Sequence, residues 1–136
     1  ITYAAADRIC VATPEDRSFV IRQFRQKPEK IAVHPNWIDT AFFAPQFRPQ
    51  QDGRILFVGR LTAQKNIETL IDALAGTGYG LDIAGDGELR TALSARAKER
   101  GVDVQFLGSL PNDDLPPLYN SYPVFVLPSH YEGNPK

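Results

Sequence analysis

Two basic residues stand in one short segment that follows an apolar run. Arg60 and Lys65 lie between a predicted strand at 55–58 and a helix predicted to begin after Asn66. Cations beside the free N–H groups of a helix start suit a diphosphate, because fixed charge, backbone donors and the helix dipole all favour an anion. Gly59 comes directly before them and permits close approach of the backbone to a ligand. The alternative is that both cations are ordinary surface charges.

Each of the other predicted strands also ends in a candidate binding loop. In an open parallel sheet, ligands bind outside the carboxyl ends of the strands. The loops read Gly85-Asp86-Gly87-Glu88, Gly108-Ser109-Leu110-Pro111 and Pro128-Ser129-His130-Tyr131-Glu132-Gly133-Asn134-Pro135. Three alternatives stay open: the glycine pair is only a tight turn, His130 is structural, and Glu132 is a solvated loop acid. Gly85 and Gly87 make a weak dinucleotide fingerprint, because Arg90 occupies the third glycine position.

The elements that must position these loops follow from the apolar pattern. Strands are predicted at 55–58, 81–84, 104–107 and 124–127, with amphipathic helices between them. Asn66 is expected to cap the first of these helices through its side chain, and Gly101 to end the second at its C-terminus. Strands alternating with helices over short connections imply a parallel sheet with right-handed crossovers.

Residues 1–49 have a different rhythm. Strands are predicted at 8–12 and 30–34, around a helix that Thr13 caps and Pro14 begins. Cys10, inside the first apolar run, is expected to be a small core residue. The Pro- and aromatic-rich stretch 35–49 is typical of a linker between domains.

The bulk properties exclude several classes of protein. The 136 residues carry a net charge of −1, which gives no support for nucleic acid as a partner. A single cysteine favours a reducing compartment, and no run approaches the length of a membrane span. We therefore expect a cytoplasmic protein. The arginines near the first helix are interpreted as a solvated face, with a peripheral contact at the inner membrane face as the alternative. No metal-ligand cluster is visible in the sequence.

Four ordered motifs resemble the GT4 family of retaining glycosyltransferases, which have the two-domain GT-B architecture. The motifs are Gly59-Arg60-Leu61 with Lys65-Asn66, then Gly85-Asp86-Gly87-Glu88-Leu89, then Phe106-Leu107-Gly108, and finally Pro128-Ser129-x-x-Glu132-Gly133-Asn134-Pro135. In addition, Asn36-x-Ile38-Asp39 is similar to the Asn-Gly-Ile-Asp signature between the two domains, with Trp37 in place of glycine.

The resemblance implies a role for each loop. Arg60 and Lys65 would hold the donor diphosphate without a metal, and Glu132 would contact the donor sugar as the first acid of a Glu-x₇-Glu motif. Those three form the implied catalytic set. The implied donor-binding set is Gly59, Gly85, Gly87, Gly108, Ser109, Leu110, His130, Gly133 and Asn134, with 108–110 at the nucleobase. Asn134 replaces the Phe common in the family.

The predicted fold is α/β. Residues 1–49 are assigned to the end of the acceptor domain and the linker, and residues 50–136 to a truncated Rossmann-like domain that binds the nucleotide sugar. The implied reaction is retaining transfer of a sugar to a hydroxyl acceptor, which the N-terminal domain mainly binds, with no cofactor beyond the donor substrate. A nucleotide-sugar epimerase and a non-catalytic nucleotide-sugar-binding module are the alternatives. The isolated 136-residue chain is expected to be inactive.

Overall fold

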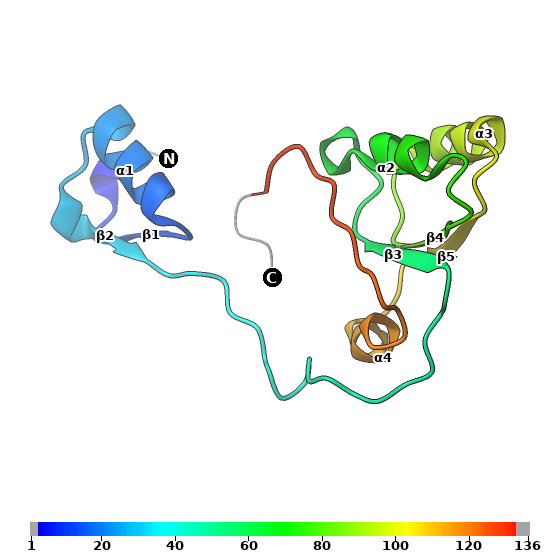
Figure 1. Cartoon of the computed structure of the whole chain (residues 1–136). Coiled ribbons are helices and arrows are strands. Elements are labelled where there is room, and N and C mark those ends of the chain that lie inside the picture. Colours follow the sequence, from blue (N-terminus) through cyan, green and yellow to red (C-terminus); the bar gives the residue numbers. More distant parts are fainter. Residues whose placement is uncertain (1–2, 133–136) are drawn as a thin grey trace. The chain divides into compact units, whose positions relative to one another are not determined.

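A computed structural model describes residues 3–132 and divides the chain into two compact units. The first unit contains the described part of residues 1–39 together with Glu132, and the second contains residues 40–131. Both units have parallel strands connected through helices (Figure 1), so the α/β fold class predicted from the sequence is confirmed.

The first unit is a strand–helix–strand motif. Strands β1 (Ile9–Val11) and β2 (Ile31–Val33) pair in parallel, and helix α1 (Pro14–Phe24) connects them. The Thr13 side chain accepts a hydrogen bond from the Asp16 N–H at 3.0 Å, which confirms the predicted cap. The small core consists of Ile9, Val20 and Ile31.

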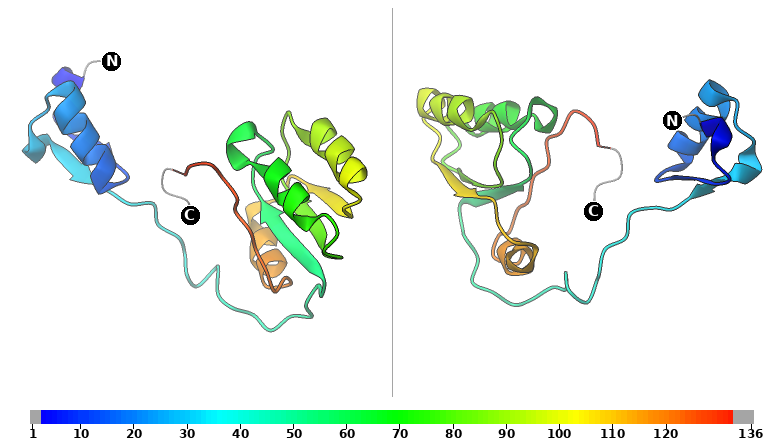
Figure 2. Two further views of the ribbon diagram at one scale, coloured as in Figure 1. Left: turned by 45° about the horizontal axis from the view of Figure 1, so that its top comes forward. Right: turned by 180° about the vertical axis from the view of Figure 1, so that it is seen from behind.

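The second unit is built on a three-stranded parallel sheet. Its strands are β3 (Arg54–Val58), β4 (Gly80–Ala84) and β5 (Val104–Gly108), paired in the order β3-β4-β5. Helices α2 (Ile67–Leu74) and α3 (Arg90–Arg100) make the two crossovers and cover the same face of the sheet, whereas α4 (Leu115–Tyr119) lies on the opposite face (Figures 1 and 2). Within residues 3–132, short 3-10 helices at Tyr3–Ala5, Pro28–Lys30, Ala63–Lys65 and Asn112–Asp114 complete the elements.

The main core lies between the sheet and helices α2 and α3. The alternation of side chains along a strand sends Leu81 and Ile83 of β4 into this core, together with the helical stripe that the sequence predicted. The members of the core that are fully buried include Phe57, Leu61, Ile71, Leu81, Ile83 and Leu93. At the end of α3, Gly101 takes a left-handed conformation with φ 66° and closes the helix, as its position in the sequence predicted.

The fourth strand predicted at 124–127 is not a full strand. This segment lies beside β3 and makes one isolated parallel bridge, between Phe125 and Leu56. The Leu56 N–H donates to the Val124 carbonyl at 3.0 Å, and the Val126 N–H donates to the Leu56 carbonyl at 2.9 Å. Within the described residues the segment pairs on one side only, so the ladder stays too short for a strand.

The second half of the predicted linker is fixed to the second unit. The side chain of Asn120, just after α4, accepts from the Gln46 N–H at 2.7 Å and donates to the Ala44 carbonyl at 3.2 Å. The Gln51 N–H donates to the Ser121 carbonyl at 2.8 Å. Residues 44–51 therefore pack along the end of α4 instead of forming a free tether.

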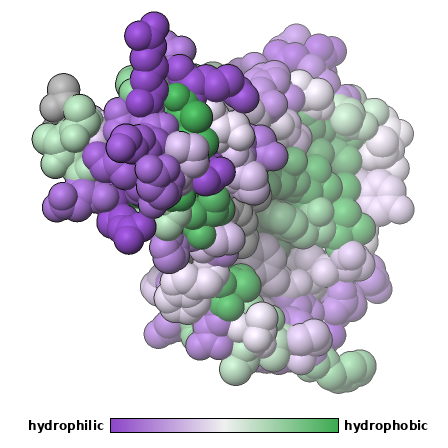
Figure 3. Space-filling model, turned by 90° about the vertical axis from the view of Figure 1, so that its left-hand side faces the viewer, coloured by the Kyte–Doolittle hydropathy of each residue, from purple (hydrophilic) through white to green (hydrophobic). Residues whose placement is uncertain are grey.

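Apolar side chains reach the surface among hydrophilic ones (Figure 3). On the first unit, the ring of Phe24 contacts those of Tyr3 and Phe19, and all three residues are exposed. The prediction that Cys10 is a core residue is wrong, because Cys10 is exposed. Neighbours in a strand point to opposite faces, and α1 covers only the face of the two-stranded sheet on which Ile9 lies.

Candidate functional site

The topology of the second unit indicates at which end of its sheet a ligand would bind. From β3 the chain moves outward to β4 and β5 with its helices on one face, then returns through α4 on the other face to segment 124–126 beside β3. The direction of winding therefore reverses between β3 and segment 124–126. Ligands of open α/β sheets bind outside the carboxyl ends of the strands at such a switch point. The loops that follow these two neighbours are 59–66 and 127–131.

The loop after β3 is anchored through its backbone. The Gly59 N–H donates to the Ala84 carbonyl at 2.9 Å, and the Leu61 N–H donates to the Asp86 carbonyl at 3.0 Å. Leu61 is fully buried in the main core and fixes the middle of the loop. On either side of this anchor, Arg60 is exposed and Lys65 is half-buried. The fold therefore holds the backbone still while it presents the Arg60 side chain to solvent.

The two glycines after β4 pack against that same loop. Gly85 has φ 134°, and a Cβ atom at this position would collide with the Gly59 carbonyl. Gly87 does not have positive φ, but a Cβ atom there would lie 2.6 Å from the Leu61 carbonyl oxygen and 2.8 Å from the Leu61 nitrogen. The Leu89 N–H also donates to the Leu61 carbonyl at 3.1 Å. The turn is therefore a structural support for the loop that carries Arg60.

The predicted side-chain cap at Asn66 is wrong. Asn66 precedes α2 with φ 52° and ψ 37°, and its side chain accepts no hydrogen bond from the helix backbone. Instead its Nδ2 donates to the Pro128 carbonyl at 3.2 Å in the other switch-point loop. The start of α2 thus lacks a side-chain cap. It lies at the carboxyl end of β3, as do Arg60 and Lys65.

The remaining predicted residues have different positions. Gly108 ends β5 with φ 75°, and its carbonyl accepts from the Gly85 N–H at 2.7 Å, so the loops after β4 and β5 adjoin. Ser109 is exposed and Leu110 is half-buried. His130 is exposed, and its N–H donates to the Gln64 carbonyl at 3.0 Å. The half-buried Glu132 groups with the first compact unit, and Gly133 and Asn134 lie outside the described residues.

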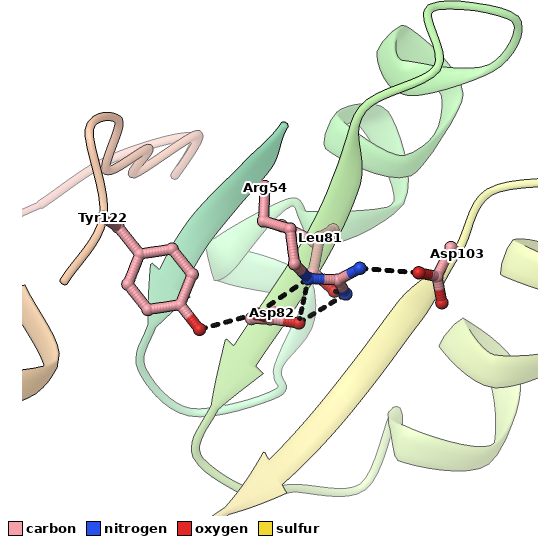
Figure 4. Close-up of polar contacts among 5 residues, drawn as sticks. All are labelled: Arg54, Leu81, Asp82, Asp103 and Tyr122. Atoms are coloured by element: carbon pink, nitrogen blue, oxygen red, sulfur yellow. Dashed lines mark hydrogen bonds and ion pairs between the residues drawn. The ribbon is translucent and has the colours of Figure 1, made fainter. Parts of the chain in front are cut away.

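A buried charge cluster on the α4 face of the sheet was not found from the sequence (Figure 4). Asp82 in β4 is 3% exposed, and the Arg54 guanidinium contacts both of its carboxylate oxygens, with Nε 2.9 Å from each. Arg54 also reaches Asp103 at 2.6 Å, and the Tyr122 hydroxyl donates to Asp82 at 2.6 Å. Arg54 lies in β3 and Asp82 in β4, Asp103 directly precedes β5, and Tyr122 follows α4. The cluster connects the sheet to residues 120–126, through which the chain returns from α4 to the side of β3. We call these residues the return segment.

Two groups of this cluster have shifted pKa values. Hydrogen bonds to Asp82 raise the pKa of the Arg54 guanidinium. Burial, followed by the bond to the Asp82 carboxylate, raises the pKa of Tyr122 to about 12. Both residues keep their protons at neutral pH, so the cluster is a stabilising network rather than an acid–base pair.

Comparison with known proteins agrees with this topology. Residues 39–135 match the model of the family described as Glycosyl transferases group 1. The chain belongs to this family. It is 40% identical over 127 residues to an uncharacterized glycosyltransferase of Methanocaldococcus jannaschii, covering 88% of this chain and 32% of the relative. It is 30% identical over 142 residues to an α-1,4-N-acetyl-D-galactosaminyltransferase of Campylobacter jejuni that acts on a diNAcBac-PP-undecaprenol-linked glycan, covering 99% of this chain and 38% of that protein.

A solved structure confirms the fold of this glycosyltransferase chain. The pneumococcal O-GlcNAc transferase GtfA, solved in complex with UDP and GlcNAc, superposes with a TM-score of 0.81 at 23% identity, covering 97% of this chain and 28% of GtfA. The match supports the GT-B fold. The chain spans about a third of the length of these relatives. No helix within residues 3–132 is both long and apolar enough to cross a membrane.

Proposed function

We propose that this glycosyltransferase chain binds the nucleotide diphosphate of a sugar donor at the switch point of its second unit. The observation that carries the proposal is the position of Arg60 and Lys65. They occupy the loop between the carboxyl end of β3 and the start of α2, which has no side-chain cap. Backbone N–H groups, the helix dipole and two cations there favour a diphosphate.

The leaving group defines the chemistry that these cations would serve. When the sugar departs, negative charge develops on the diphosphate, and fixed cations stabilise that charge as it forms. Loop 108–110 adjoins the loop after β4 through Gly108 and would extend the site toward a nucleobase. Glu132, Gly133 and Asn134 follow the second switch-point loop and would contact the sugar.

The whole protein would then transfer a sugar from a nucleotide sugar to a hydroxyl acceptor. Retention at the anomeric carbon, membership of the GT4 subfamily and independence of metals are parts of this proposal that rest on the motif resemblance. The acceptor would be bound mainly by residues outside this chain, so the isolated chain is expected to be inactive. A UDP-containing relative of the same fold makes UDP the first nucleotide to test.

Removal of the two cations tests the diphosphate site. In the full-length protein, Arg60→Ala and Lys65→Ala should each weaken the binding of UDP or another preferred nucleoside diphosphate about tenfold to a hundredfold, because charged hydrogen bonds contribute ~1.5–3 kcal/mol. Binding of the parent nucleoside should change little. Titration calorimetry against UDP, GDP and ADP measures both quantities.

Lys98→Ala provides the matched control, because Lys98 is an exposed cation on α3. It should leave diphosphate affinity unchanged. Wild-type affinity in both loop variants would remove the basis for the site. Loss of affinity for the nucleoside as well would indicate general damage to the fold.

A further inference from the structure

Three hydrogen bonds connect the two loops at the switch point. The Gln64 carbonyl accepts from the His130 N–H at 3.0 Å, and the Gln64 side chain donates from Nε2 to the Tyr131 carbonyl at 2.9 Å. The Asn66 side chain donates from Nδ2 to the Pro128 carbonyl at 3.2 Å. These bonds join residues 64–66 to residues 128–131. We call them the amide bridge.

The backbone at Asn66 suits this role. Left-handed geometry is unfavourable for most side chains, and Asn is among the few residues that adopt it at low cost. A glycine would adopt the same conformation freely but could not donate to Pro128. The residue present thus combines the required turn with a side-chain donor to the facing loop.

A second contact orients the Asn66 amide. The Thr69 hydroxyl, in the first turn of α2, donates to Asn66 Oδ1 at 2.8 Å. Because the amide oxygen accepts from Thr69, the nitrogen is directed to the Pro128 carbonyl. The Pro128 carbonyl can only accept, so it determines which atom of this side chain is the nitrogen, and the Thr69 hydroxyl then donates to the oxygen.

We infer that Gln64 and Asn66 are positioning residues that hold loop 128–131 against loop 59–66. Loop 59–66 carries the residues assigned to the diphosphate, and loop 128–131 precedes Glu132, which is assigned to the sugar. The two amides flank Lys65, and loop 128–131 leads directly to Glu132. The bridge therefore fixes residues 128–131, directly before Glu132 in the sequence, against the loop assigned to the diphosphate. This inference rests on the proposed function.

The bridge predicts a specific pattern of binding. The diphosphate contacts come from loop 59–66, which remains anchored through Leu61 when the bridge is broken. The residues assigned to the sugar, Glu132, Gly133 and Asn134, directly follow in sequence the loop that the bridge restrains. Loss of the bridge should therefore weaken binding of a nucleotide sugar more than binding of the nucleoside diphosphate.

Hydrogen exchange tests the bridge without any ligand. In the unliganded full-length protein, the variant Gln64→Ala with Asn66→Gly removes both side-chain donors and keeps the left-handed turn. Exchange in the peptide spanning 128–132 should be about fivefold to a hundredfold faster than in wild type, as expected for two lost hydrogen bonds. Gln105→Ala, an exposed glutamine on β5, is the matched control and should leave this peptide unchanged. An exchange rate in the double variant less than twofold above that of wild type would show that the two side chains do not restrain loop 128–131.

Calorimetry with UDP and UDP-glucose tests its role in binding. We expect the double variant to keep UDP affinity within about threefold of wild type and to lose at least tenfold in affinity for UDP-glucose. Equal losses for both ligands would reduce the amides to a structural role and refute the positioning inference. If wild type binds neither ligand, nor the GDP and ADP counterparts, the proposed function fails instead. In that case the exchange rates still test whether the bridge restrains loop 128–131, because that measurement needs no ligand.

Discussion

At the scale of single residues, Arg54 and Asp82 form an ion pair whose carboxylate is almost fully buried. A carboxylate that is 3% exposed has lost nearly all its hydration, and such a charge is tolerated only with excellent partners. Arg54 contacts both carboxylate oxygens, and Tyr122 donates a further hydrogen bond. Asp103, whose side chain is 69% exposed, neutralises the far side of the guanidinium. Within this cluster, the bond from Tyr122 links the return segment to the sheet, in addition to the backbone bonds between β3 and segment 124–126.

Tyr122→Phe removes this one bond and keeps the ring. It should lower the free energy of unfolding at neutral pH by about 1.5–3 kcal/mol, the contribution of a hydrogen bond to a charged group. The pKa of Tyr122 is raised from 10.0 to about 12 in the fold. The contribution is therefore complete below pH 10 and declines as pH rises toward 12, because the unfolded state loses its proton first. Denaturant unfolding from pH 7 to 12 should show the wild-type advantage shrinking above pH 10.

Tyr79→Phe is the matched control for that experiment, since Tyr79 is 53% exposed. It should stay within about 0.5 kcal/mol of wild type, as surface substitutions usually do. A Tyr122→Phe protein as stable as this control would show that the hydroxyl does not stabilise the return segment.

At the scale of elements, the turn after β4 acts as a support for the loop after β3. Gly87→Ala should destabilise the fold by about 1–3 kcal/mol, because overpacking against fixed backbone forces the chain to shift. The methyl group would lie 2.6 Å from the Leu61 carbonyl oxygen. Gly87 lacks the positive φ that Gly85 has, so the cause of the cost at Gly87 is close packing. Thermal unfolding of the variant measures the cost.

Gly76→Ala separates packing from backbone strain in that measurement. Gly76 has φ 73° with no atom within 4 Å of the added methyl group. Its substitution should cost only the ~1 kcal/mol of placing a side chain in the left-handed region. Equal costs at both positions would contradict the packing argument.

The sequence predicted those elements whose signals are local. Thr13 and Gly101 act where the pattern placed them, because a cap or a helix stop depends on a few neighbouring residues. The segment 124–127 did not form a strand, since a strand depends on pairing that the apolar pattern alone cannot supply. Asn66 failed as a cap because its partner, Pro128, lies 62 residues further along the chain. The Arg54–Asp82 pair was not predicted either, because its members are 28 positions apart in the sequence.

At the scale of the whole molecule, the candidate site depends on how distant parts of the chain meet. The order of motifs was readable from the sequence, and the family match over residues 39–135 agrees with it. The switch point was not readable, because it required the position of segment 124–126 beside β3. This topology brings loops 59–66 and 127–131 together as the two sides of the candidate site.

The full-length protein must compensate the negative charge of the donor diphosphate. A nucleotide diphosphate brings negative charge to a chain whose own net charge is −1. We propose that Arg60 and Lys65 supply the compensating charge, so a divalent ion is not needed for the leaving diphosphate. Sugar transfer should then continue at an undiminished rate after EDTA treatment, measured as release of nucleoside diphosphate from a working donor and acceptor. Added Mg²⁺ should not restore the Arg60→Ala or Lys65→Ala variants, because a free ion lacks the fixed position of a side chain. Loss of wild-type activity on chelation, with recovery in Mg²⁺ or Mn²⁺, would transfer the neutralising role to a metal and leave the two cations as auxiliary contacts.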